Sequence, residues 1–122
     1  MITISPKAGG YVSVGQVVFN GTLTAAATWQ DLNLSSYVGP KKVLCKFQVS
    51  VVGGGGGLKF CMKPRGVGGT VVQHNDVWGT GSITLTGGYF GYMVCETDLA
   101  GFVEIAANFN TETMIVTFLG YV

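Results

Sequence analysis

Catalytic chemistry in this chain would centre on His74, its single histidine. Asp76 follows two residues later, and a nearby serine would complete a nucleophile–histidine–acid arrangement. The candidates are Ser35 and Ser36, but neither lies in the Gly-x-Ser-x-Gly turn that exposes a nucleophile in many hydrolases. Because no spacing brings the three groups together, we predict that His74 is structural or solvated and that the chain is not an enzyme.

The strongest metal ligands are His74 and three cysteines, and their spacing does not resemble a zinc site. Cys45, Cys61 and Cys95 are widely separated, whereas structural zinc sites use closely spaced pairs of ligands. An odd number of cysteines would also leave one over in a disulfide framework. We therefore predict free thiols, no metal or other cofactor, and synthesis and assembly in a reducing cytoplasm.

Glu96 and Asp98 form a close pair of carboxylates, a pattern that can hold calcium or act in glycoside hydrolysis. Asp98 also begins the segment Asp-Leu-Ala-Gly, in which an Asp side chain ordinarily caps the backbone of its own turn. We predict such a turn here, with Glu104 adding negative charge on the strand that follows.

Two further features could bind a ligand. The five glycines at positions 53–57 could form a backbone nest for an anion, but they lack the Gly-Lys-Ser/Thr ending of a phosphate-binding loop. We predict instead a flexible hairpin tip or a place where another chain approaches closely. Trp78, between Asp76 and a Gly-Thr-Gly segment, could stack on a sugar or lie in a protein interface, whereas Trp29 is expected in the core.

The charged residues are few and are sorted by sign along the chain. Residues 41–65 carry six basic side chains and no acidic one, while residues 66–122 carry five acidic side chains and no basic one. Lys7 and Asp31 complete the set, and the net charge is only +1. Because a charge-poor, nearly neutral surface limits the solubility of a free monomer, we expect surfaces that bind partners.

Nucleic acid and membranes are not the expected partners. Single-stranded nucleic acid binding needs aromatic side chains among the basic ones, but Phe47 and Phe60, the aromatics of the basic block, are predicted to point inward. No apolar run is long enough for a spanning helix, and the N-terminus lacks the pattern of a signal peptide.

Apolar and polar residues alternate along the chain with glycines between the alternating segments, which is typical of short β-strands. No window shows a helical apolar stripe, although residues 32–38 could form one helical turn. We predict an all-β chain: an antiparallel β-sandwich of about eight strands, jelly-roll-like. An N-terminal arm (residues 1–10) precedes a single domain (residues 11–122). The predicted strands are residues 17–25, 28–34, 42–52, 58–63, 70–76, 82–86, 89–97, 102–108 and 113–121.

The glycines at 53–57 are predicted to join two strands as a hairpin. Phe47, Val49 and Val51 share one face of the first strand, and Phe60 and Met62 share one face of the second. A register that pairs Val51 with Phe60 buries both sets against one core.

This register has consequences for charge and for the thiols. It sends three basic residues to one outward face, which we call the basic face (Lys46, Lys59 and Lys63). We expect the basic face to meet a partner, together with an acidic block (Glu96, Asp98, Glu104 and Glu112). The register also places Cys45 and Cys61 on opposite faces of the hairpin, so we predict no disulfide between them.

Several segments together resemble small jelly-roll modules of tailed-bacteriophage virion proteins, found as capsid decoration proteins and as head- or tail-fibre tips. The segments are residues 28–39 (TWQDLNLSSYVG), 42–52, 60–66 (FCMKPRG), 94–98 (VCETD) and 118–122 (FLGYV). The resemblance implies a β-sandwich that associates as a trimer and has no enzymatic activity. The short, free-standing chain favours a decoration subunit over a fibre tip.

The expected function is therefore that of a structural virion protein. We expect a capsid decoration or head-protrusion subunit, a homotrimer that binds a major capsid or other virion protein and stabilises the capsid surface by mass action. The alternative is a carbohydrate- or receptor-binding module of a phage fibre tip, which would use Trp78 against a surface glycan.

Overall fold

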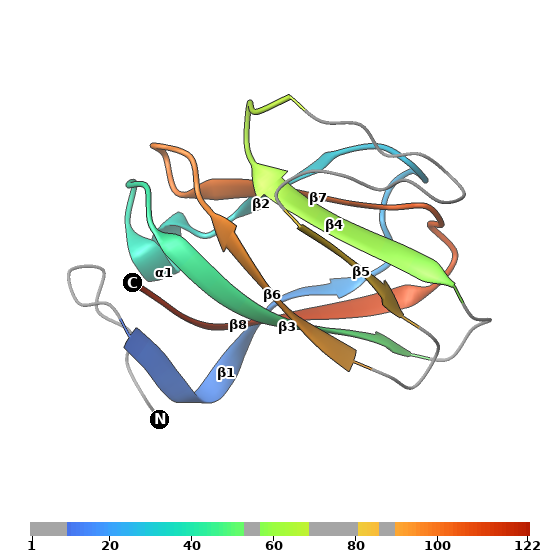
Figure 1. Ribbon diagram of the computed structural model, residues 1–122, viewed down its shortest axis with the longest axis horizontal. Helices are drawn as coiled ribbons and strands as arrows, with labels where there is room; N and C mark the ends of the chain where they lie inside the picture. The colour runs from blue at the N-terminus through green and yellow to red at the C-terminus, as the bar shows by residue number, and fades with distance from the viewer. Residues whose placement is uncertain (1–9, 53–56, 69–80, 86–89) are drawn as a thin grey trace.

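The computed structural model describes residues 10–52, 57–68, 81–85 and 90–122, which form eight strands in two antiparallel four-stranded sheets (Figure 1). Sheet A has the strand order β1-β8-β3-β6, and sheet B has the order β2-β7-β4-β5. The elements are β1 (Gly10–Gly21), β2 (Gln30–Asn33), α1 (Ser35–Val38), β3 (Leu44–Val52), β4 (Leu58–Pro64), β5 (Gly81–Leu85), β6 (Phe90–Glu96), β7 (Phe102–Ala107) and β8 (Thr113–Tyr121). The prediction of an all-β antiparallel sandwich is confirmed.

The strand pairing is that of a jelly roll. β1 pairs with β8, β2 with β7, β3 with β6, and β4 with β5, all antiparallel. This nested order results when one long hairpin with β4 and β5 at its tip folds over, so that its strand pairs alternate between the two sheets. The jelly-roll-like topology predicted from the sequence is therefore confirmed.

One core lies between the two sheets. β3 shows strict alternation of buried with half-buried or exposed residues, and β8 shows it as far as Gly120, as a sheet with one face on a core requires. The largest fully buried side chains come from both sheets and include Phe47 and Phe118 of sheet A and Phe60, Met62 and Ile105 of sheet B.

The predicted hairpin between β3 and β4 is wrong, because the two strands belong to different sheets. β3 pairs with β6 and β8, while β4 pairs with β5 and β7. The inward residues Phe47 and Phe60 do share one core, but they reach it from opposite sides. Burial of two apolar sets fixes which face of each strand points inward; it does not distinguish neighbouring strands from strands that face each other across a sandwich.

The other element predictions are mostly confirmed within a few residues. α1 falls inside the predicted helical turn, and its C-cap Gly39 has a φ of 84°. β1 begins at Gly10, well before the predicted start at residue 17. The predicted strand at 70–76 lies outside the described residues, as do His74, Trp78 and positions 53–56 of the glycine run.

Candidate functional site

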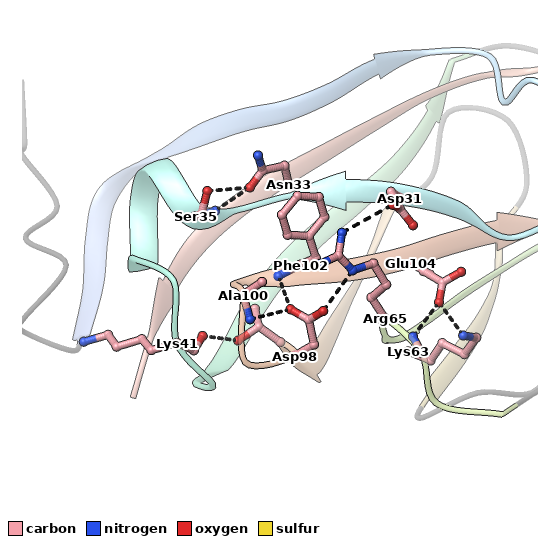
Figure 2. Close-up of polar contacts among 12 residues, drawn as sticks. Asp31, Asn33, Ser35, Lys41, Lys63, Arg65, Asp98, Ala100, Phe102 and Glu104 are labelled. Atoms are coloured by element: carbon pink, nitrogen blue, oxygen red, sulfur yellow. Dashed lines mark hydrogen bonds and ion pairs between the residues drawn. The ribbon is translucent and has the colours of Figure 1, made fainter.

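A cluster of charged side chains covers the outer face of sheet B near the α1 end of the sandwich (Figure 2). We call it the charged cluster (Asp31, Lys63, Arg65, Asp98 and Glu104). Its centre is set by the pairing of β4 with β7, which places Lys63 opposite Glu104. The Lys63 ammonium lies 2.6 Å from Oε1 of Glu104, and these side chains are only 5% and 15% exposed. Lys63 also lies 4.8 Å from the centre of the Trp29 ring.

Arg65 joins this pair to the neighbouring carboxylates. Its Nε donates to Oδ2 of Asp98 at 2.9 Å, and its Nη1 lies 3.6 Å from Oδ2 of Asp31. The guanidinium is 3.7 Å from the centre of the Phe102 ring, a cation–π contact. Figure 2 shows Arg65 between the two aspartates and beside Phe102.

Asp98 caps the turn between β6 and β7. Its Oδ1 accepts the N–H groups of Ala100 and Phe102, each at 2.9 Å. Gly101 in this turn has a φ of 85°, and a Cβ there would lie 2.5 Å from the carbonyl oxygen of Gly39. The predicted Asp-x-x-Gly turn is confirmed, and glycine is required where the turn packs on the α1 segment.

The electrostatics of the charged cluster do not suit acid–base catalysis. Burial pushes the pKa of Glu104 upward, but hydrogen bonds from Lys63 and the Gly66 N–H, with the charges of Lys63 and Arg65, outweigh it and hold that pKa below its usual range. Burial likewise raises the pKa of Asp98, but its backbone hydrogen bonds and its contact with Arg65 lower it overall. Both carboxylates are therefore ionised at neutral pH and act as acceptors, whereas a general acid needs a raised pKa.

The predicted basic face does not exist as one surface. Lys46 belongs to β3 in sheet A, while Lys59 and Lys63 belong to β4 in sheet B. Lys63 does lie on the outer side of sheet B, but it is buried there against Glu104 and Trp29 instead of solvated. The prediction is wrong because it depended on the β3–β4 hairpin.

The acidic block is also divided. Glu96, Asp98 and Glu104 gather at or near the α1 end of the sandwich, whereas Glu112 lies in the connection between β7 and β8 at the other end. Oε2 of Glu112 is buried and has no hydrogen-bond partner among the described residues.

The two charge blocks of the sequence meet within one chain. Among the described residues, three contacts join a basic side chain of residues 41–65 to an acidic one of residues 66–122: Lys42–Glu96 at 3.3 Å, Lys63–Glu104 at 2.6 Å and Arg65–Asp98 at 2.9 Å. Lys63 and Glu104 come from separate blocks of the sequence and meet because β4 and β7 are neighbours in the sheet although they are distant in the chain. The charge pattern thus describes internal pairing for these six residues.

The thiols are buried and free, as predicted. Burial, followed by the neighbouring Cys95, raises the pKa of Cys45 to about 12. Cys61 lies on the outer side of sheet B beside Ala106, where the half-buried Trp29 packs on it. The expectation that Trp29 belongs to the main core is therefore wrong, but the expectation that Cys45 and Cys61 lie on different faces holds.

Sequence reasoning missed a surface on β6. Phe90, Tyr92 and Val94 are 57%, 55% and 52% exposed, and we call them the β6 stripe. The rings of Phe90 and Tyr92 meet edge to face with centroids 5.8 Å apart. Since Met93 and Cys95 on the opposite face are also apolar, alternation could not identify the outward face of β6. The presence of apolar residues on both faces of this strand was itself a sign of an exposed apolar surface.

A shallow pocket of about 200 Å³ opens at the α1 end between the Lys42–Glu96 and Arg65–Asp98 pairs. Ligand pockets are usually larger, about 300–1,000 Å³. Each of the four charged side chains that line it already has a partner of opposite charge. A ligand would have to displace one of these contacts, so the pocket is a weak candidate site.

No protein-family model matches this chain, and a search of the curated proteins also found no match. In the part of the chain that the structure describes, no helix is long and apolar enough to cross a membrane. Within the same residues, no group of three His, Cys, Asp or Glu side chains could hold a metal ion.

Proposed function

We propose that this chain is a non-catalytic structural subunit of a tailed-bacteriophage virion. It acts as a capsid decoration or head-protrusion subunit, forms a homotrimer and binds the major capsid protein or another virion protein. Binding only to the assembled shell stabilises the shell by mass action. The resemblance of residues 28–39 and of the other segments to phage jelly-roll modules is the origin of the proposal.

One structural observation supports a role in association. The carboxylates Asp98 and Glu104 are held by partners within the chain, while the β6 stripe leaves three large apolar side chains more than half exposed. Exposed apolar clusters of this kind mark interaction surfaces in soluble proteins. Burial of the β6 stripe against a partner would therefore be favourable. The carboxylates of Asp98 and Glu104 are held by internal contacts and are not arranged for acid–base catalysis.

Light scattering on a size-exclusion column tests self-association, and co-sedimentation with shells tests capsid binding. The shells are made by expressing the major capsid protein of the proposed virion, with and without the chain. We expect a trimer that sediments with the shells and raises their dissociation temperature. A stable monomer that leaves the shells unchanged would contradict the proposal. A glycan array with the intact chain and with Trp78→Ala tests the receptor-binding alternative; a sugar signal lost in the variant would favour that alternative.

A further inference from the structure

β6 is an edge strand whose outer side is unpaired among the described residues. It is the last strand of sheet A and pairs only with β3. Edge strands present a row of free N–H and C=O groups, and most natural proteins protect them with charges, proline or a covering segment.

The hydrogen-bond pattern shows which residues of β6 present these groups. Leu44 of β3 exchanges both backbone hydrogen bonds with Val122, at 3.1 and 2.9 Å, so its polar groups point toward β8. Backbone groups alternate in direction along a strand, so those of Val43 and Cys45 point toward β6. The Thr97 N–H indeed donates to the Val43 carbonyl at 2.9 Å.

The register then assigns the free side of β6. Cys45 is opposite Cys95, and Phe47 is opposite Met93, so the odd-numbered residues of β6 face β3. The even-numbered residues therefore point their N–H and C=O groups away from the sheet. These residues include Phe90, Tyr92 and Val94, which are also the residues with exposed apolar side chains. One row of residues thus offers both main-chain hydrogen bonds and an apolar surface, the two components of recognition by strand addition.

We infer that residues 2–5 of a neighbouring copy add as a strand to the free edge of β6; the inference rests on the proposed assembly into a homotrimer. These residues read Ile2-Thr3-Ile4-Ser5, with apolar and polar side chains in strict alternation. Such a segment places Ile2 and Ile4 on the face of the β6 stripe and its polar residues on the other face. Pro6 ends the pairing because it has no N–H to donate.

The position of β1 favours a neighbour as the donor. β1 begins at Gly10 on the edge of sheet A that is opposite to β6. A segment paired beside β6 would lie four strand spacings, about 19 Å, from β1 of the same copy, whereas the five steps from Ser5 to Gly10 span at most about 18 Å. Phe90, Tyr92 and Val94 are each more than half exposed, so none of the described residues of the same copy covers them fully. A contact from one edge to the opposite edge of the next copy is heterologous, the type that closes into a ring such as a trimer.

Charge substitutions at the two partners test this contact. Ile4→Asp alters the donor segment, and Val94→Lys alters the acceptor edge. Val17→Lys is a matched control, because Val17 lies on β1 of the same sheet and is 55% exposed, against 52% for Val94. Sedimentation equilibrium should show association weakened at least about tenfold by Ile4→Asp and by Val94→Lys, and unchanged by Val17→Lys. Equal association of Ile4→Asp and the wild type would overturn the inference.

Cross-linking identifies the donor directly. Full-length Ile4→Cys and Tyr92→Cys chains are mixed and treated with a short bismaleimide; the native thiols are buried and react slowly. We expect a covalent product of two chains that contains one copy of each variant. A product of two Tyr92→Cys chains alone, or a product of monomer mass from the double variant, would refute the neighbour's N-terminal segment as occupant. If cross-linking gives one of these refuting products but the wild type is trimeric and binds shells, only the inference fails and the proposed function stands. If the wild type is monomeric and does not bind shells, the proposed function fails as well.

Discussion

The pair of Lys63 and Glu104 should contribute more to stability than the exposed pair of Lys42 and Glu96. Glu104→Gln keeps the shape of the side chain but leaves the Lys63 ammonium, 5% exposed, without a counter-charge. Removing one partner of a buried ion pair typically costs about 3–5 kcal/mol. Since Glu104 retains 15% exposure and Lys63 retains its contact with the Trp29 ring, we expect the lower part of that range, about 3 kcal/mol.

A double-mutant cycle separates the interaction energy of the two charges from the packing of the aliphatic parts of the two side chains. Lys63→Met should also destabilise the chain, because it leaves the Glu104 carboxylate with only the Gly66 N–H at 3.0 Å. The double variant Lys63→Met/Glu104→Gln buries no unpaired charge, so we expect it to be more stable than the sum of the single losses predicts, by about 2 kcal/mol. The same cycle on Lys42 and Glu96 is the control. That pair is 3.3 Å apart but about half exposed, and its coupling should be below about 1 kcal/mol.

Urea unfolding followed by circular dichroism gives these free energies of unfolding. For a domain of this size, Glu104→Gln should also lower the melting temperature by about 10 °C, since each kcal/mol shifts it by several degrees. Equal coupling in the two cycles would refute the reasoning, because burial would then have no effect on the strength of the pair. A double variant less stable than either single variant would refute it as well.

The remaining predictions concern the turn, the thiols, acid pH and salt. Gly101→Ala should cost at least about 3 kcal/mol in urea unfolding, against about 1–2 for Gly66→Ala, because both have a φ of 85° but only Gly101 has backbone within 2.5 Å of the added Cβ. Cys45 and Cys61, whose pKa values burial raises to about 12, should resist iodoacetamide at about pH 8 until urea unfolds the chain. Because the pKa of Asp98 is lowered from 3.8, its contribution to stability is complete above that pH and is lost as the pH falls through the lower folded-state value; Asp98→Asn should flatten the acid limb of the unfolding curve. The association constant, measured by sedimentation, should change less than about tenfold between low and high salt, whereas a ring joined through opposite charges would weaken strongly.

The strands could be predicted because a strand of a β-sandwich has one buried face, so apolar residues recur at every second position of the sequence. β3 is the clearest case: Cys45, Phe47, Val49 and Val51 alternate with half-buried polar residues, and the predicted and observed strands differ by only two residues at one end. β1 was harder, since its pairing with β8 contains two register shifts that break a simple alternation. The alternation of apolar and polar residues therefore located strands best where the strand pairing has no register shift.

Strand pairing could not be predicted to the same degree. Phe47 and Phe60 must both point inward, and a hairpin or two facing sheets satisfy that condition equally. The wrong hairpin also made the predicted basic face wrong, because the outward lysines of β3 and β4 were placed on one face. The structure shows the pairing that the sequence did not reveal: Lys63 and Glu104 meet as a buried pair where β4 lies beside β7.

The separation of charge along the chain and the exposed stripe on β6 have one physical connection. In a jelly roll, β4 and β7 are paired although they are distant in sequence, so opposite charges placed in separate segments of the chain meet across this pairing. These charges support one strand order and one register on sheet B. They are then not available for attracting a partner. The proposed association would instead draw on the apolar side chains of β6 and on its backbone edge, which is unpaired among the described residues, because each exposed apolar side chain removed from water contributes roughly 25 cal/mol for every Å² buried. Internal pairing on sheet B and the proposed association at the edge of sheet A would thus follow from one topology.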